Sequence, residues 1–301
     1  MISKLSLAAT AIATLVSCSP APHRTFKEPE DAVRALDEAV AKGNVKEVLA
    51  IFGPEGHALL DSSDPVTAAR NRQVFSVAVS EGWRLVDEEN RGKVLVIGNE
   101  GWPFPVPLVK RANGWMFDTA AGREEVIARR IGRNELAVIR ICQTYVAVQQ
   151  RYARDGHDGK PPGRYATKFR SDPGSQNGLY WPAAPGQKRS PLGDLVADAA
   201  LDGRTDNTQS PPSPFHGYYF KILTSQGPAA DGGKKDYVVN GEMLGGFALV
   251  AWPAEYDVTG IMTFVVNDDA IVREKNLGPF TGATARGMTT YNPDGSWRAV
   301  P

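Results

Sequence analysis

The sequence predicts an α+β protein made of two units, because the same change of hydrophobic pattern occurs twice along the chain. Apolar residues recur at helical spacing over residues 28–53 and then alternate with polar residues over 83–118. A second helical stretch over 123–153 precedes strand-like segments between residues 218 and 274. Helices followed by antiparallel strands are typical of α+β domains, in which helices cover one face of a sheet.

The N-terminal unit is predicted over residues 28–121 and should begin with three helices. Pro29 suits the first position of a helix. Gly43 can end that helix, and Asn44 can cap the next one. The pair Asp64-Pro65 should open the third helix.

An antiparallel meander should complete this unit. Asn90-Arg91-Gly92 separates the strands of a first hairpin, and Asn113-Gly114 predicts a type I′ turn in a second. The prolines within residues 102–105 exclude that segment from a central strand.

The C-terminal unit is predicted over residues 122–301. Its helix covers residues 123–153, where Gly132 could introduce a kink. Proline- and glycine-rich loops are expected over 155–190 and 203–214. The expected strands follow in this order: 218–224, 237–239, 247–252, 262–266 and 271–274.

Residues 1–17 are typical of a bacterial signal peptide, with Lys4 as the only charged side chain before a short apolar stretch. The segment Leu15–Cys18 resembles the lipobox of bacterial lipoproteins, which implies cleavage before Cys18 and acylation of that cysteine. The alternatives are an ordinary secretory signal cut near Ala21, or a buried N-terminal helix.

The lipoprotein interpretation also predicts where the protein resides. By resemblance to Gram-negative lipoproteins, Ser19 after Cys18 implies the outer membrane, with the protein facing the periplasm. Residues 18–27 would form a short tether between the lipid anchor and the folded chain.

Composition excludes some classes of partner and of chemistry. The chain has 34 basic and 34 acidic residues and a formal net charge of zero, without a basic patch that would indicate nucleic-acid binding. With Cys18 acylated, Cys142 has no disulfide partner, and its place in a helical apolar run favours a buried structural residue over a nucleophile.

His216 is the one candidate catalytic residue, as a general base beside Gly217 at the start of a strand. No serine or cysteine nucleophile motif accompanies it, which favours a structural role. The other histidines show no metal-ligand spacing, and we expect neither a metal nor a cofactor.

Two glycine-containing motifs fit structural roles better than ligand binding. Residues 155–159 faintly resemble the beginning of a calcium loop but lack its alternating acidic ligands. Residues 241–246 are glycine-rich but do not open a helix as phosphate-binding loops do, so hairpin turns explain them better.

Aromatic residues beside proline or glycine form a candidate binding surface for a glycan or a peptide. The alternative, which we favour, is that they form the core and interdomain packing. The residues concerned are Trp102, Phe104, Tyr180, Trp181, Phe215, Tyr218, Tyr219 and Trp252.

Several long blocks of sequence resemble a bacterial secreted family, the domain of unknown function DUF2950. The blocks lie at residues 102–110, 128–136, 178–183, 215–228 and 240–267. This resemblance covers nearly the whole chain after the signal peptide and implies no catalytic residue.

Weaker resemblances concern architecture alone. The N-terminal unit is similar to cystatin-like or NTF2-like folds. The C-terminal helix and strands resemble the globular part of type IV pilins and pseudopilins, although the hydrophobic filament helix is missing from the start of that unit.

Together these features lead us to expect an envelope lipoprotein that acts as a non-enzymatic binding, scaffolding or assembly-assisting module. Its partners would be the membrane, through Cys18, and an envelope protein or glycan. The alternative is an envelope hydrolase that uses His216 as its general base.

Overall fold

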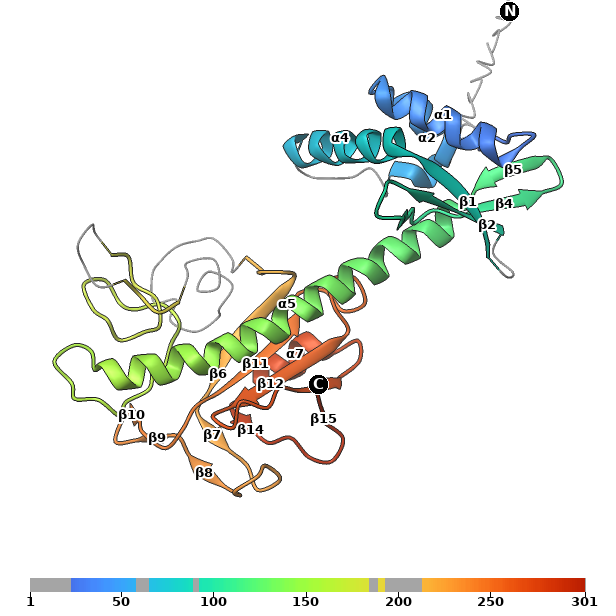
Figure 1. Ribbon diagram of the computed structural model, residues 1–301. Coiled ribbons are helices and arrows are strands. Elements are labelled where there is room, and N and C mark those ends of the chain that lie inside the picture. Colours follow the sequence, from blue (N-terminus) through green and yellow to red (C-terminus); the bar gives the residue numbers. More distant parts are fainter. Residues whose placement is uncertain (1–22, 58–64, 89–91, 184–188, 193–212, 301) are drawn as a thin grey trace, which may run out of the picture. The chain divides into compact units, whose positions relative to one another are not determined.

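The computed structural model describes residues 23–57, 65–88, 92–183, 189–192 and 213–300 (Figure 1). The chain forms two compact units, Met1–Val126 (unit 1) and Ile127–Pro301 (unit 2). Helices and antiparallel sheets occur in both, which confirms the predicted α+β class. Cys18 and most of the loop expected over 203–214 lie outside the described residues.

Unit 1 begins with the predicted helices α1 (Pro29–Ala41), α2 (Val45–Phe52) and α4 (Pro65–Glu81), with a short 3-10 helix, Pro54–Gly56, after α2. The Asn44 side chain caps α2 by accepting a hydrogen bond from the Glu47 N–H at 3.2 Å. Gly43 has a φ of 62°, a conformation that suits glycine after the end of α1.

The sheet of unit 1 is antiparallel and has the order β1-β2-β4-β5, with β3 paired to β2. Its strands are β1 (Trp83–Glu88), β2 (Gly92–Ile97), β3 (Trp102–Pro103), β4 (Leu108–Arg111) and β5 (Gly114–Phe117). β3 pairs with β2 alone, so Pro103 lies in an edge strand, where proline is tolerated.

The second hairpin exists as predicted, but its turn differs from the expected one. Arg111 pairs with Gly114, so the loop consists of Ala112 and Asn113, and neither has the positive φ that a type I′ turn requires. Gly114 belongs to β5 instead. A Cβ there would lie 2.3 Å from the carbonyl oxygen of Phe26, so the close approach of Phe26 explains the glycine.

The core of unit 1 lies between the helices and one face of the sheet (Figure 1). It includes Leu36, Ile51, Leu95 and Phe117. Phe26 is also buried there, and its backbone exchanges hydrogen bonds of 2.8 and 2.7 Å with Trp115. The end of the segment expected to be a tether over 18–27 therefore packs as part of the folded unit.

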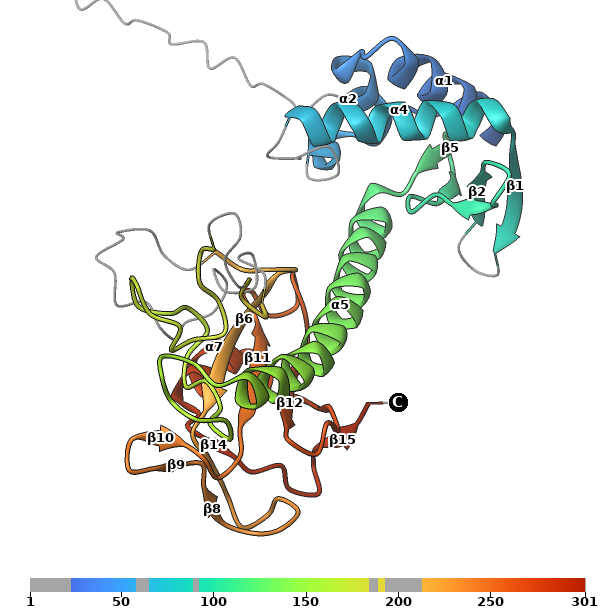
Figure 2. The same cartoon turned by 60° about the vertical axis from the view of Figure 1, so that its left-hand side comes forward.

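Unit 2 is built on a five-stranded antiparallel sheet of order β15-β13-β12-β11-β6. The strands are β6 (Tyr218–Leu223), β11 (Ala248–Pro253), β12 (Met262–Asn267), β13 (Arg273–Asn276) and β15 (Arg298–Ala299). All six residues of β11 are buried, because α5 (Thr119–Asp155) lies along the sheet and α7 (Thr281–Gly287) also packs against β11 (Figure 2).

Helix α5 is a single helix of 37 residues, and Gly132 does not divide it. The boundary between the two units lies within it, a few residues beyond the predicted junction at 121 and 122. Its buried residues recur three or four positions apart, as a helix packed on a sheet requires. They include Val138, Cys142, Tyr145, Gln149 and Tyr152.

Short strands extend unit 2 beyond the main sheet. β7 (Ser225–Gln226) lies between β14 (Thr290–Tyr291), its parallel partner, and β8 (Lys235–Asp236). β9 (Val238–Val239) and β10 (Glu242–Met243) form a hairpin whose turn residues, Asn240 and Gly241, have φ values of 52° and 78°. Both values are positive, which is the backbone conformation expected for an Asn-Gly hairpin turn.

Within the described residues, no helix is both long enough and apolar enough to span a bilayer.

Candidate functional site

The structure places His216 at the turn before β6, with a φ of 48° and an exposed side chain. Its ring lies beside that of Phe215, with the ring centroids 4.4 Å apart. No hydrogen bond or ion pair joins the ring to another described residue. A general base needs such a neighbour to orient it, or a nucleophile to activate, and the described surroundings of His216 provide neither.

The aromatic residues of the candidate binding surface differ in their exposure. Trp102 is 47% exposed, whereas Trp181, Tyr218 and Trp252 are buried. Phe104 is half-buried and packs in the aromatic core of unit 1. The other three are also half-buried: Tyr180, Phe215 and Tyr219. Trp102 and Phe104 belong to unit 1, and the rest belong to unit 2.

Unit 2 contains a polar pocket of about 220 Å³. One wall is the loop that follows α5, over residues 156–168, and another is the β9–β10 hairpin. Two hydrogen bonds connect these walls. The Tyr165 N–H donates to the Met243 carbonyl at 2.9 Å, and the Arg164 side chain reaches Glu242.

Positive backbone φ angles give the loop its tight path. Gly156, Asp158 and Gly159 have φ values of 63°, 51° and 72°. At Gly156 a Cβ would lie 2.8 Å from the Lys160 carbonyl oxygen, so a larger residue would obstruct the turn. The resemblance of residues 155–159 to a calcium loop is thus explained by a turn, and no group of three potential metal ligands occurs in the described part of the chain.

The turn is anchored to the segment around Gln176. The Asp158 carboxylate accepts hydrogen bonds from the Ser175 hydroxyl at 2.6 Å and from the Gln176 N–H at 2.8 Å. The Tyr152 hydroxyl donates to the Gln176 carbonyl at 2.7 Å. Burial, with a further effect from Asp158, raises the pKa of Tyr152 to about 12, so this phenol keeps its proton at neutral pH.

His157 packs into the same anchor. Its ring stacks on Tyr152 with the centroids 4.1 Å apart, and its Nδ1 lies 3.2 Å from the Gln176 side-chain oxygen. Its Nε2 is buried without a hydrogen-bond partner. An atom that is closed off from solvent in this way cannot contact a molecule in the open pocket, so His157 contributes support for the wall.

The basic side chains of the pocket are held by acids. Glu242 lies 3.1 Å from Lys160 and 2.6 Å from the Nε of Arg164, and Lys168 lies 2.5 Å from Asp172. The hydrogen bonds from Arg164 and Lys160 lower the pKa of Glu242, so its carboxylate is ionised at neutral pH. The Nη1 of Arg164 also donates to the Pro161 carbonyl at 3.1 Å.

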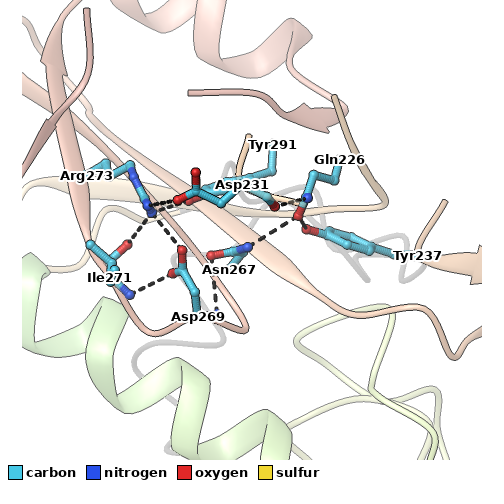
Figure 3. Close-up of polar contacts among 8 residues, drawn as sticks. All are labelled: Gln226, Asp231, Tyr237, Asn267, Asp269, Ile271, Arg273 and Tyr291. Atoms are coloured by element: carbon cyan, nitrogen blue, oxygen red, sulfur yellow. Dashed lines mark hydrogen bonds and ion pairs between the residues drawn. The ribbon is translucent and has the colours of Figure 1, made fainter. Parts of the chain in front are cut away.

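A second polar cluster joins several strands of unit 2 and is filled by its own contacts (Figure 3). The Gln226 amide donates to the carbonyls of Asp231 and Gly233, and its oxygen accepts from Tyr237 at 2.7 Å and Asn267 at 3.3 Å. These four bonds use the full capacity of an amide side chain. Gln226 is therefore a structural connection with no group left for a ligand.

Arg273 has the same connecting role at the other end of this cluster (Figure 3). It donates to the Tyr291 hydroxyl at 2.6 Å and pairs with Asp269 at 3.0 Å and Asp231 at 3.1 Å. The cluster thus fixes the turn between β12 and β13 against β14, and the pocket between the α5 loop and the β9–β10 hairpin is the better candidate site.

Comparison with known proteins places the whole folded chain in one family. The family model described as Protein of unknown function (DUF2950) matches residues 23–300. The chain belongs to this family. Membership confirms the resemblance drawn from the sequence blocks, and the match covers the folded part of both units. No curated protein and no solved structure matches the chain.

Each wall of the pocket contains a segment that the sequence predicted to be an ordinary turn, residues 155–159 and residues 241–246. The roles of Lys160, Arg164, Lys168 and Glu242 were not predicted. The three basic residues recur every fourth position in a proline-rich loop. This spacing is the one local signal from which a cationic site could have been predicted. Their acidic partner Glu242 is 78 residues from Arg164, and no local pattern pairs residues at that distance.

Proposed function

We propose that this protein is a lipid-anchored envelope protein that acts as a non-enzymatic binding module and holds a small ligand in the pocket of unit 2. The observation that carries the proposal is the pocket itself. It has a volume of about 220 Å³ and is lined mainly by polar side chains on a braced loop and a hairpin. Pockets for drug-sized ligands measure about 300–1,000 Å³, so the expected ligand has the size of an amino acid or a single sugar.

Preformed walls favour binding because little ordering has to accompany it. The α5 loop is held by Asp158 and Tyr152 through Gln176, and the hairpin is held to the loop by Tyr165. A ligand would enter a site whose backbone is already in place.

The alternative of a hydrolase based on His216 has less support. A hydrolytic site needs a base oriented by a hydrogen bond and a nucleophile or water held beside it. The His216 ring makes no polar contact with another described residue, and His216 is not among the residues that line the pocket.

The test is whether the purified lipoprotein retains a small molecule through this pocket. The protein is incubated with the low-molecular-weight fraction of a periplasmic extract and separated by gel filtration, and bound molecules are identified by mass spectrometry. Thr167→Trp places a bulky side chain at an exposed position that lines the pocket and should abolish retention. Thr284→Trp, at an exposed position on α7, is the matched control and should retain the molecule.

Equal retention by both tryptophan variants would place any bound molecule outside the pocket and refute the proposal. A released substrate fragment in place of an intact ligand would favour the hydrolase instead.

A further inference from the structure

More cationic than anionic side chains line the pocket. Among the described residues that line it, Lys160, Arg164 and Lys168 are cationic, whereas Asp158 and Glu242 are anionic. The side chains of Arg164 and Lys168 are 28% and 19% exposed, which places their charges partly out of bulk water, whereas the Lys160 side chain is 57% exposed. Electrostatic interactions at such sites are stronger than between fully solvated groups.

The imbalance between available hydrogen-bond donors and acceptors is larger than the imbalance of charge. Both acids already use their oxygens within the protein, since Asp158 accepts from Ser175 and Gln176, and Glu242 pairs with Lys160 and Arg164. The cationic side chains, by contrast, have N–H donors that make no hydrogen bond within the described part of the protein. An ammonium group has three N–H donors and a guanidinium has five.

Arg164 is an example of a side chain with unused donors. Its Nε and Nη1 donate to Glu242 and Pro161, whereas its Nη2 makes no hydrogen bond with another described residue. Lys160 and Lys168 each contact one carboxylate, which leaves further N–H groups on each. The cations of the pocket therefore have N–H donors to offer a ligand, whereas both of its carboxylates already pair with donors of the protein.

Building on the proposed function, we infer that this pocket binds the acidic group of a small organic anion, a carboxylate or a phosphate, at Arg164 and Lys160, and that Glu242 competes with it. Charge-assisted hydrogen bonds are the strongest that a donor-rich site can offer, and the planar guanidinium suits both kinds of acid. In the absence of an anion, Glu242 pairs with both cations and keeps the loop and the hairpin together.

The competition has a direct consequence for affinity. An anion that approaches Arg164 and Lys160 meets the negative charge of Glu242 beside them, which opposes binding. Glu242→Gln keeps the size of the side chain and its hydrogen-bonding oxygen but removes that charge. Binding of an anion should therefore be stronger in this variant.

The experiment compares charged probes with neutral counterparts that lack the acidic group, by isothermal titration calorimetry on the full chain. One pair is N-acetylalanine and N-acetylalaninamide, and the other is glycerol phosphate and glycerol. At least one charged probe should bind about tenfold or more tightly than its neutral partner. The charged probe that binds more tightly identifies the acid as a carboxylate or a phosphate.

Three variants locate the site. Arg164→Gln should weaken the charged probe about tenfold or more, whereas Arg286→Gln, which removes the same charge from an exposed residue of α7, should leave binding unchanged. Glu242→Gln should strengthen binding about threefold. Circular dichroism on each variant verifies that it is folded.

The inference is overturned if neither charged probe binds at about 10 mM, well above the range of a millimolar site. It is also overturned if charged and neutral probes bind equally, or if Glu242→Gln weakens the charged probe. These results are distinct from failure of the proposed function. A neutral molecule retained from the extract and lost in Thr167→Trp would preserve the binding role while refuting the anion.

Discussion

Glu135 on α5 accepts the backbone N–H of Ile261 with its Oε1 at 2.8 Å, and the same oxygen accepts the N–H of Met262 at 2.9 Å. The neighbouring Asn134 donates to the Thr259 carbonyl at 2.8 Å. Two successive side chains of the helix therefore hold the segment that leads into β12. A charged acceptor can compensate backbone donors that the sheet does not use at this point.

The first prediction is that Glu135→Ala lowers the stability of unit 2 by about 2 kcal/mol, because it leaves two backbone donors without their acceptor. Glu135→Gln keeps a side-chain oxygen and should lose about half as much. Urea unfolding followed by circular dichroism measures both. Gln143→Ala, at an exposed position on the part of the same helix that belongs to unit 2, is the control and should change stability by less than about 0.5 kcal/mol. A loss as large in the control would show that removing any polar side chain from this helix lowers stability, and that the contact with Ile261 is not responsible.

The second prediction is that Cys142 is inert in the folded protein. Its side chain is fully buried, as the helical pattern of its segment predicts, and burial raises the pKa of the thiol to about 12. The thiolate is the reactive form, so neither access nor ionisation favours labelling at neutral pH. In a chain that begins at residue 23, where Cys142 is the only cysteine, a chromogenic disulfide reagent should react in denaturant and not in buffer. Rapid reaction in buffer would contradict this. Cys142→Ala should cost about 1 kcal/mol of stability.

The third prediction concerns alkaline pH. Tyr152 has a pKa of about 12 in the folded protein, against an ordinary value of 10.0. The folded state thus keeps a proton that the unfolded chain loses, and its stability is complete below pH 10.0 and declines as pH rises toward about 12. Burial also raises the pKa of Tyr218, Tyr237 and Tyr291, so the decline has several contributions.

The measurement is urea unfolding at intervals from neutral pH to pH 12. Tyr152→Phe removes one titrating group and should make the decline shallower. It should also reduce stability at neutral pH by about 1 kcal/mol, because the hydrogen bond to Gln176 is lost. The same slope in both proteins would mean that Tyr152 titrates alike in the folded and unfolded chains.

The fourth prediction is that Cys18 attaches the protein to the membrane. Cys18→Ala should move the protein from the membrane fraction to the soluble envelope fraction and abolish incorporation of labelled fatty acid, because acyl chains supply the membrane affinity. Fractionation and labelling are measured together. A Cys18→Ala protein that still carries lipid would rule out the lipobox interpretation, and Cys142→Ala should behave as the unmodified protein.

Local patterns predicted most of the elements and few of the contacts. Pro29, Gly43 and Asn44 mark the limits of α1 and α2 because capping depends on residues only a few positions apart. Asn240-Gly241 likewise produces its hairpin turn within four residues. The turn at Asn113-Gly114 differs from expectation because a distant segment, the backbone of Phe26, requires the glycine in the strand.

The candidate site was less predictable for the same reason. Tyr165 and Met243 bring together two segments that each resemble an ordinary turn, and the donor-rich character of the pocket exists only once they meet. The ion pair between Arg164 and Glu242 is easily explained by their opposite charges once the fold is known. The two residues are 78 positions apart, so no periodic pattern in the sequence relates them.

The last prediction is that the two units fold independently. The buried core of unit 1 draws on residues from Phe26 to Phe117, and that of unit 2 on residues from Val138 to Tyr291. Among the described strands, no sheet combines strands of both units. Fragments 23–126 and 127–301 should therefore each be soluble and unfold cooperatively in urea. If neither fragment folds alone but the mixture does, the units depend on each other and the division is wrong.

The start of the first fragment is decisive for this test. Phe26 is buried, and its N–H and carbonyl bond to Trp115 at 2.8 and 2.7 Å, so a fragment that begins at residue 28 lacks part of the core and of the sheet. Phe26→Ala in fragment 23–126 should lower its stability by about 3 kcal/mol, the usual cost of removing a buried aromatic ring. Fragment 28–126 should lose at least as much, since it also lacks the two backbone hydrogen bonds. Equal stability of the fragments beginning at 23 and 28 would show that residues 23–27 are a tether after all.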